Sequence, residues 1–149
     1  MKVREELLRS CYGYVNERIL RLEASVRDLE HDLGNETKSS AGDKYETSRE
    51  MINAEISQLE RQLKEFKKLK GILSLPQLQK ASTAIQLGSI VITNTANYFV
   101  AIPVGEVNIN KEKFYAIGIN SPMAQLLNGK QKGDVFTFRE KEVKILDVY

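Results

Sequence analysis

Apolar residues recur every seven positions along the first half of the chain. The first series comprises Leu8, Val15, Leu22 and Leu29, and a second series, offset by four, comprises Tyr12, Ile19 and Val26. After an interruption the pattern resumes with Ile52, Leu59, Phe66 and Leu73, and its offset series holds Ile56 and Leu63. Such repeats place apolar side chains along one seam of a helix. Two long helices are therefore predicted.

The segment between the two repeats, residues 34–42, is rich in Gly, Asn, Ser and Thr. These residues favour turns, and the segment is too short to form a domain. We therefore expect an antiparallel coiled-coil hairpin over residues 1–75. Its first arm, residues 2–33, would be about 45–50 Å long at 1.5 Å per residue.

All three prolines lie in the second half of the chain: Pro76 at the connector, and Pro103 and Pro122 in residues 80–149. Residues 80–149 also contain short β-branched and aromatic runs. The predicted strands are 89–93, 98–104, 114–119, 135–138 and 143–148. One short helix interrupts them, because Ser121 suits an N-cap, Pro122 the first helical position, and Gly129 the position after the end. The chain is thus predicted to be α+β, with a small antiparallel sheet and one helix after the hairpin.

Composition narrows the class of protein. With 149 residues, 42% apolar and 28% charged, the chain suits one domain or two small ones and excludes a large multidomain enzyme. The net charge of +2 gives no argument for general binding to nucleic acid or membranes. Cys11 has no disulfide partner, and no signal-peptide or membrane-spanning stretch opens the chain. A cytoplasmic protein with no membrane contact is expected.

Charge varies along the predicted hairpin. Residues 28–50, around the turn, hold seven acids and three bases, a net charge of −4. Residues 61–70, at the other end, hold five bases and one acid, a net charge of +4. For the basic end, a solvated helix face is the simpler interpretation. The turn end is acidic and is the candidate for chemistry.

Self-contained catalysis is not expected. The single histidine, His31, and the single cysteine, Cys11, lie on one predicted helix, about 30 Å apart along its axis. This separation excludes Cys-His catalysis and a Cys/His zinc site within the chain. No phosphate-binding Gly-Lys-Ser/Thr loop and no dinucleotide-binding glycine motif is present.

Gly42-Asp43-Lys44-Tyr45-Glu46 is the informative acidic stretch. Asp43 and Glu46 are three residues apart, so their carboxylates would share one face of a helical turn. Such a pair suits Mg²⁺, which prefers oxygen ligands. The same spacing also forms a capping box, which needs no function. Both interpretations stay open, and Glu36 and Glu50 are weaker candidate helpers.

An acidic-tipped coiled-coil hairpin before a small β domain resembles the bacterial Gre family of transcript cleavage factors. Ser121-Pro122-Met123-Ala124-Gln125-Leu126-Leu127-Asn128-Gly129-Lys130-Gln131-Lys132-Gly133-Asp134 is similar to the family's Ser-Pro-x-Ala-x-x-(apolar)-x-Gly-x-x-x-Gly-Asp segment. In the family this segment belongs to an FKBP-like C-terminal domain. Gly42-Asp43-x-x-Glu46 is similar to the family's Gly-Asp-x-x-Glu at the hairpin tip.

The resemblance implies a monomeric partner of the bacterial RNA polymerase elongation complex. The β domain would dock at the rim of the polymerase's secondary channel, through Ser121, Pro122 and Met123. The hairpin would enter the channel, where Asp43 and Glu46 would act in catalysis by helping to hold a Mg²⁺ shared with the polymerase. The implied result is cleavage of backtracked RNA near its 3′ end by the polymerase itself.

Three other interpretations remain. Residues 47–50 read Thr-Ser-Arg-Glu where the family has Asn-Ala-Glu-Tyr, which leaves open a channel-binding regulator without cleavage activity. An FKBP-like domain also suggests a prolyl isomerase, but the aromatic residues alternate along predicted strands, as core residues do. A rod that only dimerises would leave its apolar seams exposed in the monomer.

Overall fold

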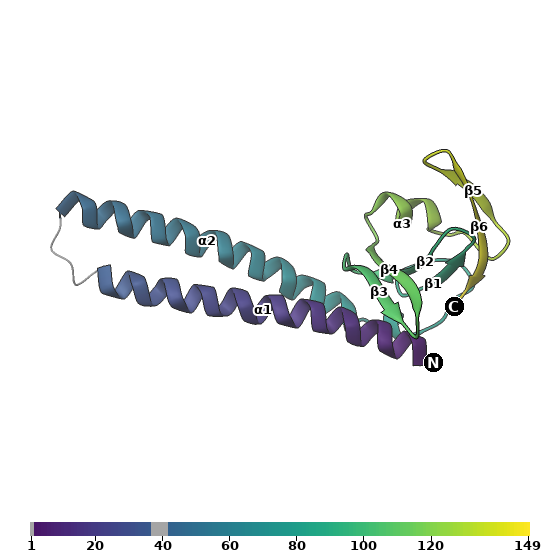
Figure 1. The fold of residues 1–149 in the computed structure, drawn as a ribbon, viewed down its shortest axis with the longest axis horizontal. Helices are drawn as coiled ribbons and strands as arrows, with labels where there is room; N and C mark the ends of the chain where they lie inside the picture. The colour runs from purple at the N-terminus through teal and green to yellow at the C-terminus, as the bar shows by residue number, and fades with distance from the viewer. Residues whose placement is uncertain (1, 37–41) are drawn as a thin grey trace. The chain divides into compact units, whose positions relative to one another are not determined.

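The computed structural model describes residues 2–36 and 42–149, with side chains for residues 2–35 and 47–149. Over this part of the chain, two long helices precede a six-stranded mixed sheet and one short α-helix, so the fold is α+β (Figure 1). The elements in chain order are α1 (Lys2–Glu36), α2 (Gly42–Leu73), the 3-10 helix η1 (Pro76–Gln79), β1 (Ile90–Thr93), β2 (Asn97–Ala101), β3 (Gly105–Ile109), β4 (Glu112–Gly118), α3 (Pro122–Leu127), β5 (Val135–Phe138) and β6 (Lys141–Val148).

The chain divides into two compact units. The first unit combines Met1–Tyr14 with Gly71–Tyr149, and the second comprises Val15–Lys70. The start of α1 and the end of α2 therefore belong to the same unit as the sheet. The first unit is discontinuous in sequence, because the whole second unit is inserted between its two segments.

In the second unit, α1 and α2 lie side by side (Figure 1). The protected side chains follow the heptad series: on α1 they include Val15, Ile19, Leu22, Val26 and Leu29, and on α2 they include Ile52, Ile56, Leu59, Leu63 and Phe66. Leu20 and Met51, which fall outside both series, are 66% and 68% exposed. An ion pair of 3.8 Å joins Glu23 of α1 to Lys67 of α2. Each apolar stripe is thus shielded from water.

The sheet has the strand order β3-β4-β2-β1-β6-β5. All pairs of adjacent strands are antiparallel except β2 and β4, which run parallel. The prediction of a purely antiparallel sheet is therefore wrong. The reason is that β3 and β4 form a hairpin whose second strand, not its first, pairs with β2.

Strand β3 was not predicted from the sequence. Its five residues, Gly105–Ile109, read as a loop because they include Gly, Glu and Asn, which are uncommon in strands. Only Val107 and Ile109 are buried, as expected for an edge strand with one protected face. The turn that follows uses Asn110 and Lys111 with φ of 50° and 69°, the positive values of a two-residue hairpin turn.

The sheet buries apolar side chains on both faces. Against one face lies α3, where Met123, Ala124 and Leu127 join Val91, Val100 and Ile145 in one cluster. The strand register places Ile90, Phe99 and Ala116 together on the opposite face. These three side chains are at most 1% exposed. Since this face is also covered, we infer that the buried start of α1 and end of α2 shield it within the same unit.

The buried guanidinium of Arg4 links the start of α1 to distant chain segments. Its Nη1 donates hydrogen bonds to the carbonyls of Leu78, at 2.8 Å, and Gly88, at 2.5 Å. The residue is 7% exposed, and burial lowers the pKa of Arg4 from its ordinary value. Gly88 lies at a close approach, because a Cβ there would be 2.1 Å from the carbonyl oxygen of Gln77. Arg4 thus ties α1 to η1 and to the start of the sheet.

We expect Arg4→Met to lower the free energy of unfolding of this unit. Methionine fills much of the space but leaves the two carbonyls without a donor, at a cost of about 1–3 kcal/mol for each. Urea titration followed by circular dichroism measures the change. Arg9→Met, at an exposed position of the same helix, is the matched control. Equal stability of the two variants would contradict the role assigned to Arg4.

Candidate functional site

The predicted acidic pair lies at the start of α2. Asp43 is the second residue of this helix and Glu46 is the fifth, so the backbone keeps both in its first turns. Carboxylates are favoured at this end of a helix by its dipole. The side chains of Glu36, Asp43 and Glu46 lie outside the described residues, whereas Glu50 is described and exposed. The proposed metal-binding geometry therefore stays a prediction.

The candidate docking segment is described in full. The Ser121 hydroxyl accepts a hydrogen bond of 3.2 Å from the Ala124 amide, which caps α3, and Pro122 occupies its first position. At the other end, the Asn128 amide donates to the Ala124 carbonyl at 2.9 Å. Gly129 follows with a φ of 81°, a conformation that favours glycine. The predicted cap, first residue and stop of this helix are confirmed.

Backbone hydrogen bonds fasten the second half of this segment to the domain. The Ile85 amide donates a hydrogen bond to the Lys130 carbonyl at 2.8 Å. The Gly129 amide donates one to the Ile85 carbonyl, also at 2.8 Å. Further along, the Asp134 carboxylate accepts a bond of 2.8 Å from the Gln131 amide. The Gly133 amide donates to the Ile145 carbonyl of β6, also at 2.8 Å. The Ser-Pro helix and the Gly-Asp turn thus form one rigid surface element.

Only part of the predicted docking set is at the surface. Pro122 is exposed and Ser121 is half-buried, but Met123 is 8% exposed and packs in the core cluster. Two apolar side chains that we did not predict are exposed in or beside the helix: Ile119 at 50% and Leu126 at 37%. The sequence does not reveal that these two side chains are exposed, because exposure depends on which side of the segment packs against the sheet. The exposed apolar residues in or beside this helix therefore include Ile119, Pro122 and Leu126.

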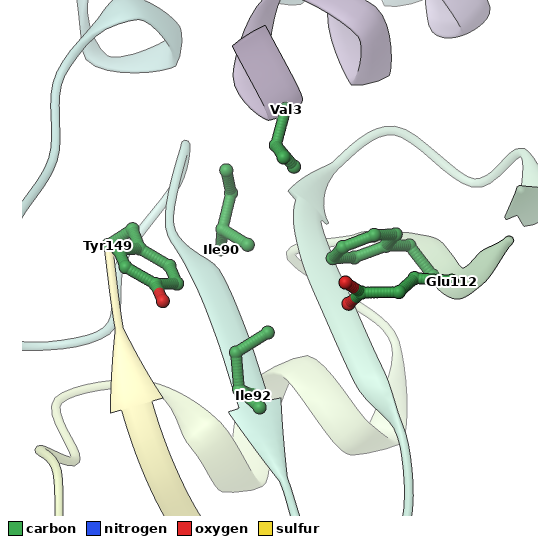
Figure 2. Close-up of a pocket in the computed structure, with 6 residues that line it drawn as sticks. Val3, Ile90, Ile92, Glu112 and Tyr149 are labelled. Carbon is green, nitrogen blue, oxygen red and sulfur yellow. The ribbon is translucent and has the colours of Figure 1, made fainter. Parts of the chain in front are cut away.

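A recess on the opposite face of the sheet is a second candidate. It is lined by Val3, Ile90, Ile92, Glu112, Phe114 and Tyr149 (Figure 2). Sequence reasoning missed it because its walls come from the start of α1, two non-adjacent strands and the residue after β6. The one local signal was the alternation of Ile90 and Ile92, which places both side chains on one face of β1.

The remaining reactive groups make no site within the described residues. Cys11 is buried, and desolvation raises the pKa of its thiol to about 12. His31 is exposed on α1. Among the described side chains, no group of three His, Cys, Asp or Glu residues is close enough to hold a metal ion. No described helix combines the length and apolar character needed to span a bilayer.

Comparison with known proteins adds no family assignment: no protein-family model matches the chain, and a search of curated proteins returns no significant match.

We expect Cys11 to resist thiol reagents in the folded protein. A pKa of about 12 leaves almost no thiolate at pH 8, and the thiolate is the reactive form. Reaction with Ellman's reagent at pH 8 is therefore expected to be slow in buffer and rapid in 6 M guanidinium, where an ordinary cysteine pKa is about 8.5. Rapid labelling of the folded protein would contradict the burial of this thiol.

We expect Ser121→Ala to destabilise the α3 segment by about 0.5–2 kcal/mol, the usual cost of losing an N-cap. The substitution removes the acceptor for the Ala124 amide and leaves the exposed residues unchanged. Hydrogen exchange of the Ala124 amide measures the local effect, and urea titration measures the global one. Lys132→Ala, at an exposed position in the turn after this helix, is the control. Unchanged exchange at Ala124 would contradict the capping role.

Proposed function

We propose that this protein is a transcription elongation factor of the Gre type. Its α1 and α2 form an antiparallel coiled-coil hairpin, and its sheet with α3 is an FKBP-like domain. The domain docks on bacterial RNA polymerase at the rim of the secondary channel. The hairpin enters the channel and stimulates the polymerase to cleave backtracked RNA.

The observation that carries the proposal is the local structure of residues 121–134. Each fixed position of the Gre-like motif has its own physical requirement: a cap at Ser121, a buried small side chain at Ala124, and positive φ at Gly129 and Gly133. These requirements are those of a capped helix followed by glycine turns. The segment thus has the local structure that the resemblance implies, and this agreement supports the proposal.

Contacts in the second unit support the hairpin. The Glu23–Lys67 ion pair joins the two helices within this unit. Leu22 shares a recess with Phe66 and Gln62, and Asn16 shares another with Lys70. Residue numbers therefore fall along α2 as they rise along α1, which is the order of an antiparallel pair. An antiparallel pairing would bring the end of α1 to the start of α2, where Asp43 and Glu46 lie.

The acids of that end suit the proposed chemistry. Asp43 and Glu46 are oxygen donors one turn apart on α2, and such donors fit Mg²⁺. When bound, a divalent ion can activate water and stabilise charge during phosphodiester cleavage. Asp43 and Glu46 would support this ion in the polymerase active site and orient the attacking water. The factor thus supplies ligands, and the polymerase carries out the reaction.

A second candidate function is occupation of the channel without cleavage. Residues 47–50 differ from the Gre tip, and Arg49 brings a positive charge next to the acidic pair. A basic group there reduces the negative charge available to a second metal ion. Such a factor would compete with substrate or with other factors for the channel.

The first test is RNA shortening by a purified, deliberately backtracked bacterial elongation complex. We expect the wild-type protein to stimulate cleavage, and Asp43→Asn with Glu46→Gln to reduce the rate by about 10- to 100-fold, as loss of groups that support a metal does. The double variant should bind the polymerase with wild-type affinity. Glu55→Gln with Glu60→Gln, two exposed acids further along α2, is the matched control.

The outcomes separate the two candidates. Cleavage lost only in the tip variant supports the Gre-type function. Binding without cleavage by the wild type supports the channel-occupying regulator. If the wild type does not bind the polymerase, both candidates are wrong, and a prolyl-isomerase assay on a Pro-containing peptide becomes the next experiment.

A further inference from the structure

The recess on the sheet face opposite α3 has an apolar floor and enough room for a side chain. Its apolar lining comprises Val3 and Ile92, which are half-buried, above Ile90 and Phe114, which are buried, and the cavity volume is about 120 Å³. Apolar cavities of about 150 Å³ accept a molecule the size of benzene. A chain of four methylene groups is of comparable bulk. The recess is thus suited to one unbranched side chain rather than to a large ligand.

The rim of this recess is acidic. Figure 2 shows the Glu112 carboxylate and the Tyr149 hydroxyl turned toward the recess from opposite sides. Asp147 pairs with Ile92 in the strand register, so it lies on the same face of the sheet. The charge of Asp147, desolvation, a side-chain hydrogen bond with Asp147 and, least, the charge of Glu112 raise the pKa of Tyr149. Both carboxylates are therefore close enough to act on the same space.

Among the described residues, no positively charged side chain lines this space. Of the six lining residues, only Glu112 is charged at neutral pH. Glu112 is exposed, and the ion pair of the neighbouring Lys113 goes to Glu106 rather than to Glu112. A cation that enters the recess would therefore meet the negative charge of Glu112. It would not have to break an ion pair between Glu112 and Lys113.

We propose that this recess binds a lysine side chain presented by a protein partner. The methylene groups of the lysine would contact Val3 and Ile92, the half-buried apolar residues of the lining, while the ammonium group would reach Glu112, with the charge of Asp147 nearby. Lysine combines these two properties, an apolar stem and a compact charged head. An acidic side chain would be repelled by the rim, and a neutral one would bury the stem without using the carboxylates.

This proposal does not rest on the proposed function in transcription. The recess lies on the opposite face of the sheet from α3, and none of its residues belongs to the acidic pair or to residues 121–134. A test in the absence of polymerase therefore decides it separately.

The test is NMR titration of the full-length ¹⁵N-labelled protein with small lysine probes. The probe is Nα-acetyl-lysine N-methylamide, and two analogues lack its charge: the norleucine compound, which keeps the stem, and the Nε-acetylated compound. We expect saturable chemical-shift changes at Ile90, Ile92, Glu112 and Tyr149 for the lysine probe. We expect both uncharged analogues to bind more weakly, by about two- to fivefold, the effect of one partly exposed ion pair.

Variants of the protein complete the test. Glu112→Gln, an exposed change that should not disturb folding, is expected to weaken lysine binding about two- to fivefold. Ile92→Phe is expected to fill the recess and abolish the shifts. Glu142→Gln, at an exposed position elsewhere on the sheet, is the control and should bind as the wild type does. Norleucine binding equal to lysine binding, shifts outside the recess, or no effect of Glu112→Gln would each overturn the proposal.

Discussion

The sheet unit depends on the buried guanidinium of Arg4. Two carbonyls that are 74 and 84 residues further along the chain accept its hydrogen bonds. A charged group buried this deeply is costly, so its hydrogen bonds must compensate for lost hydration. Nη1 meets this requirement with its two bonds, whereas Nη2 is buried with no hydrogen-bond partner among the described residues. The two bonds of Nη1 hold the first turn of α1 beside the start of the sheet. The recess depends on the same contact, because Val3, its α1 wall, is the residue before Arg4.

Much of the fold could be predicted because its determinants are local. A seven-residue apolar repeat is sufficient to identify α1 and α2, and Ser121, Pro122 and Gly129 mark the ends of α3. The mixed sheet could not be predicted in this way. Whether β3 or β4 pairs with β2 depends on how a hairpin folds back, and Gly105–Ile109 alone has weak strand character. Pairing between strands is a property of the assembled sheet rather than of one segment.

The candidate sites also differ in how far the local sequence determines them. Asp43 and Glu46 were identifiable because their spacing matches one helical turn, and a motif identified residues 121–134. The exposure of Leu126 and the burial of Met123 could not be predicted, because neighbouring positions of α3 differ only in which side faces the core. The recess was beyond prediction, because Val3 and Tyr149 approach one sheet face from opposite ends of the chain.

The discontinuity of the sheet unit has a consequence for protein synthesis. The ribosome releases the amino end first, so α1 emerges with Arg4 long before either of its carbonyl partners exists. The second unit, Val15–Lys70, is a continuous segment and can begin to fold during translation. The sheet unit must wait for strands near the carboxyl end, because β6 lies between β1 and β5. Until then the apolar first turns of α1 are exposed, and a delay in translation of the second half would lengthen that period.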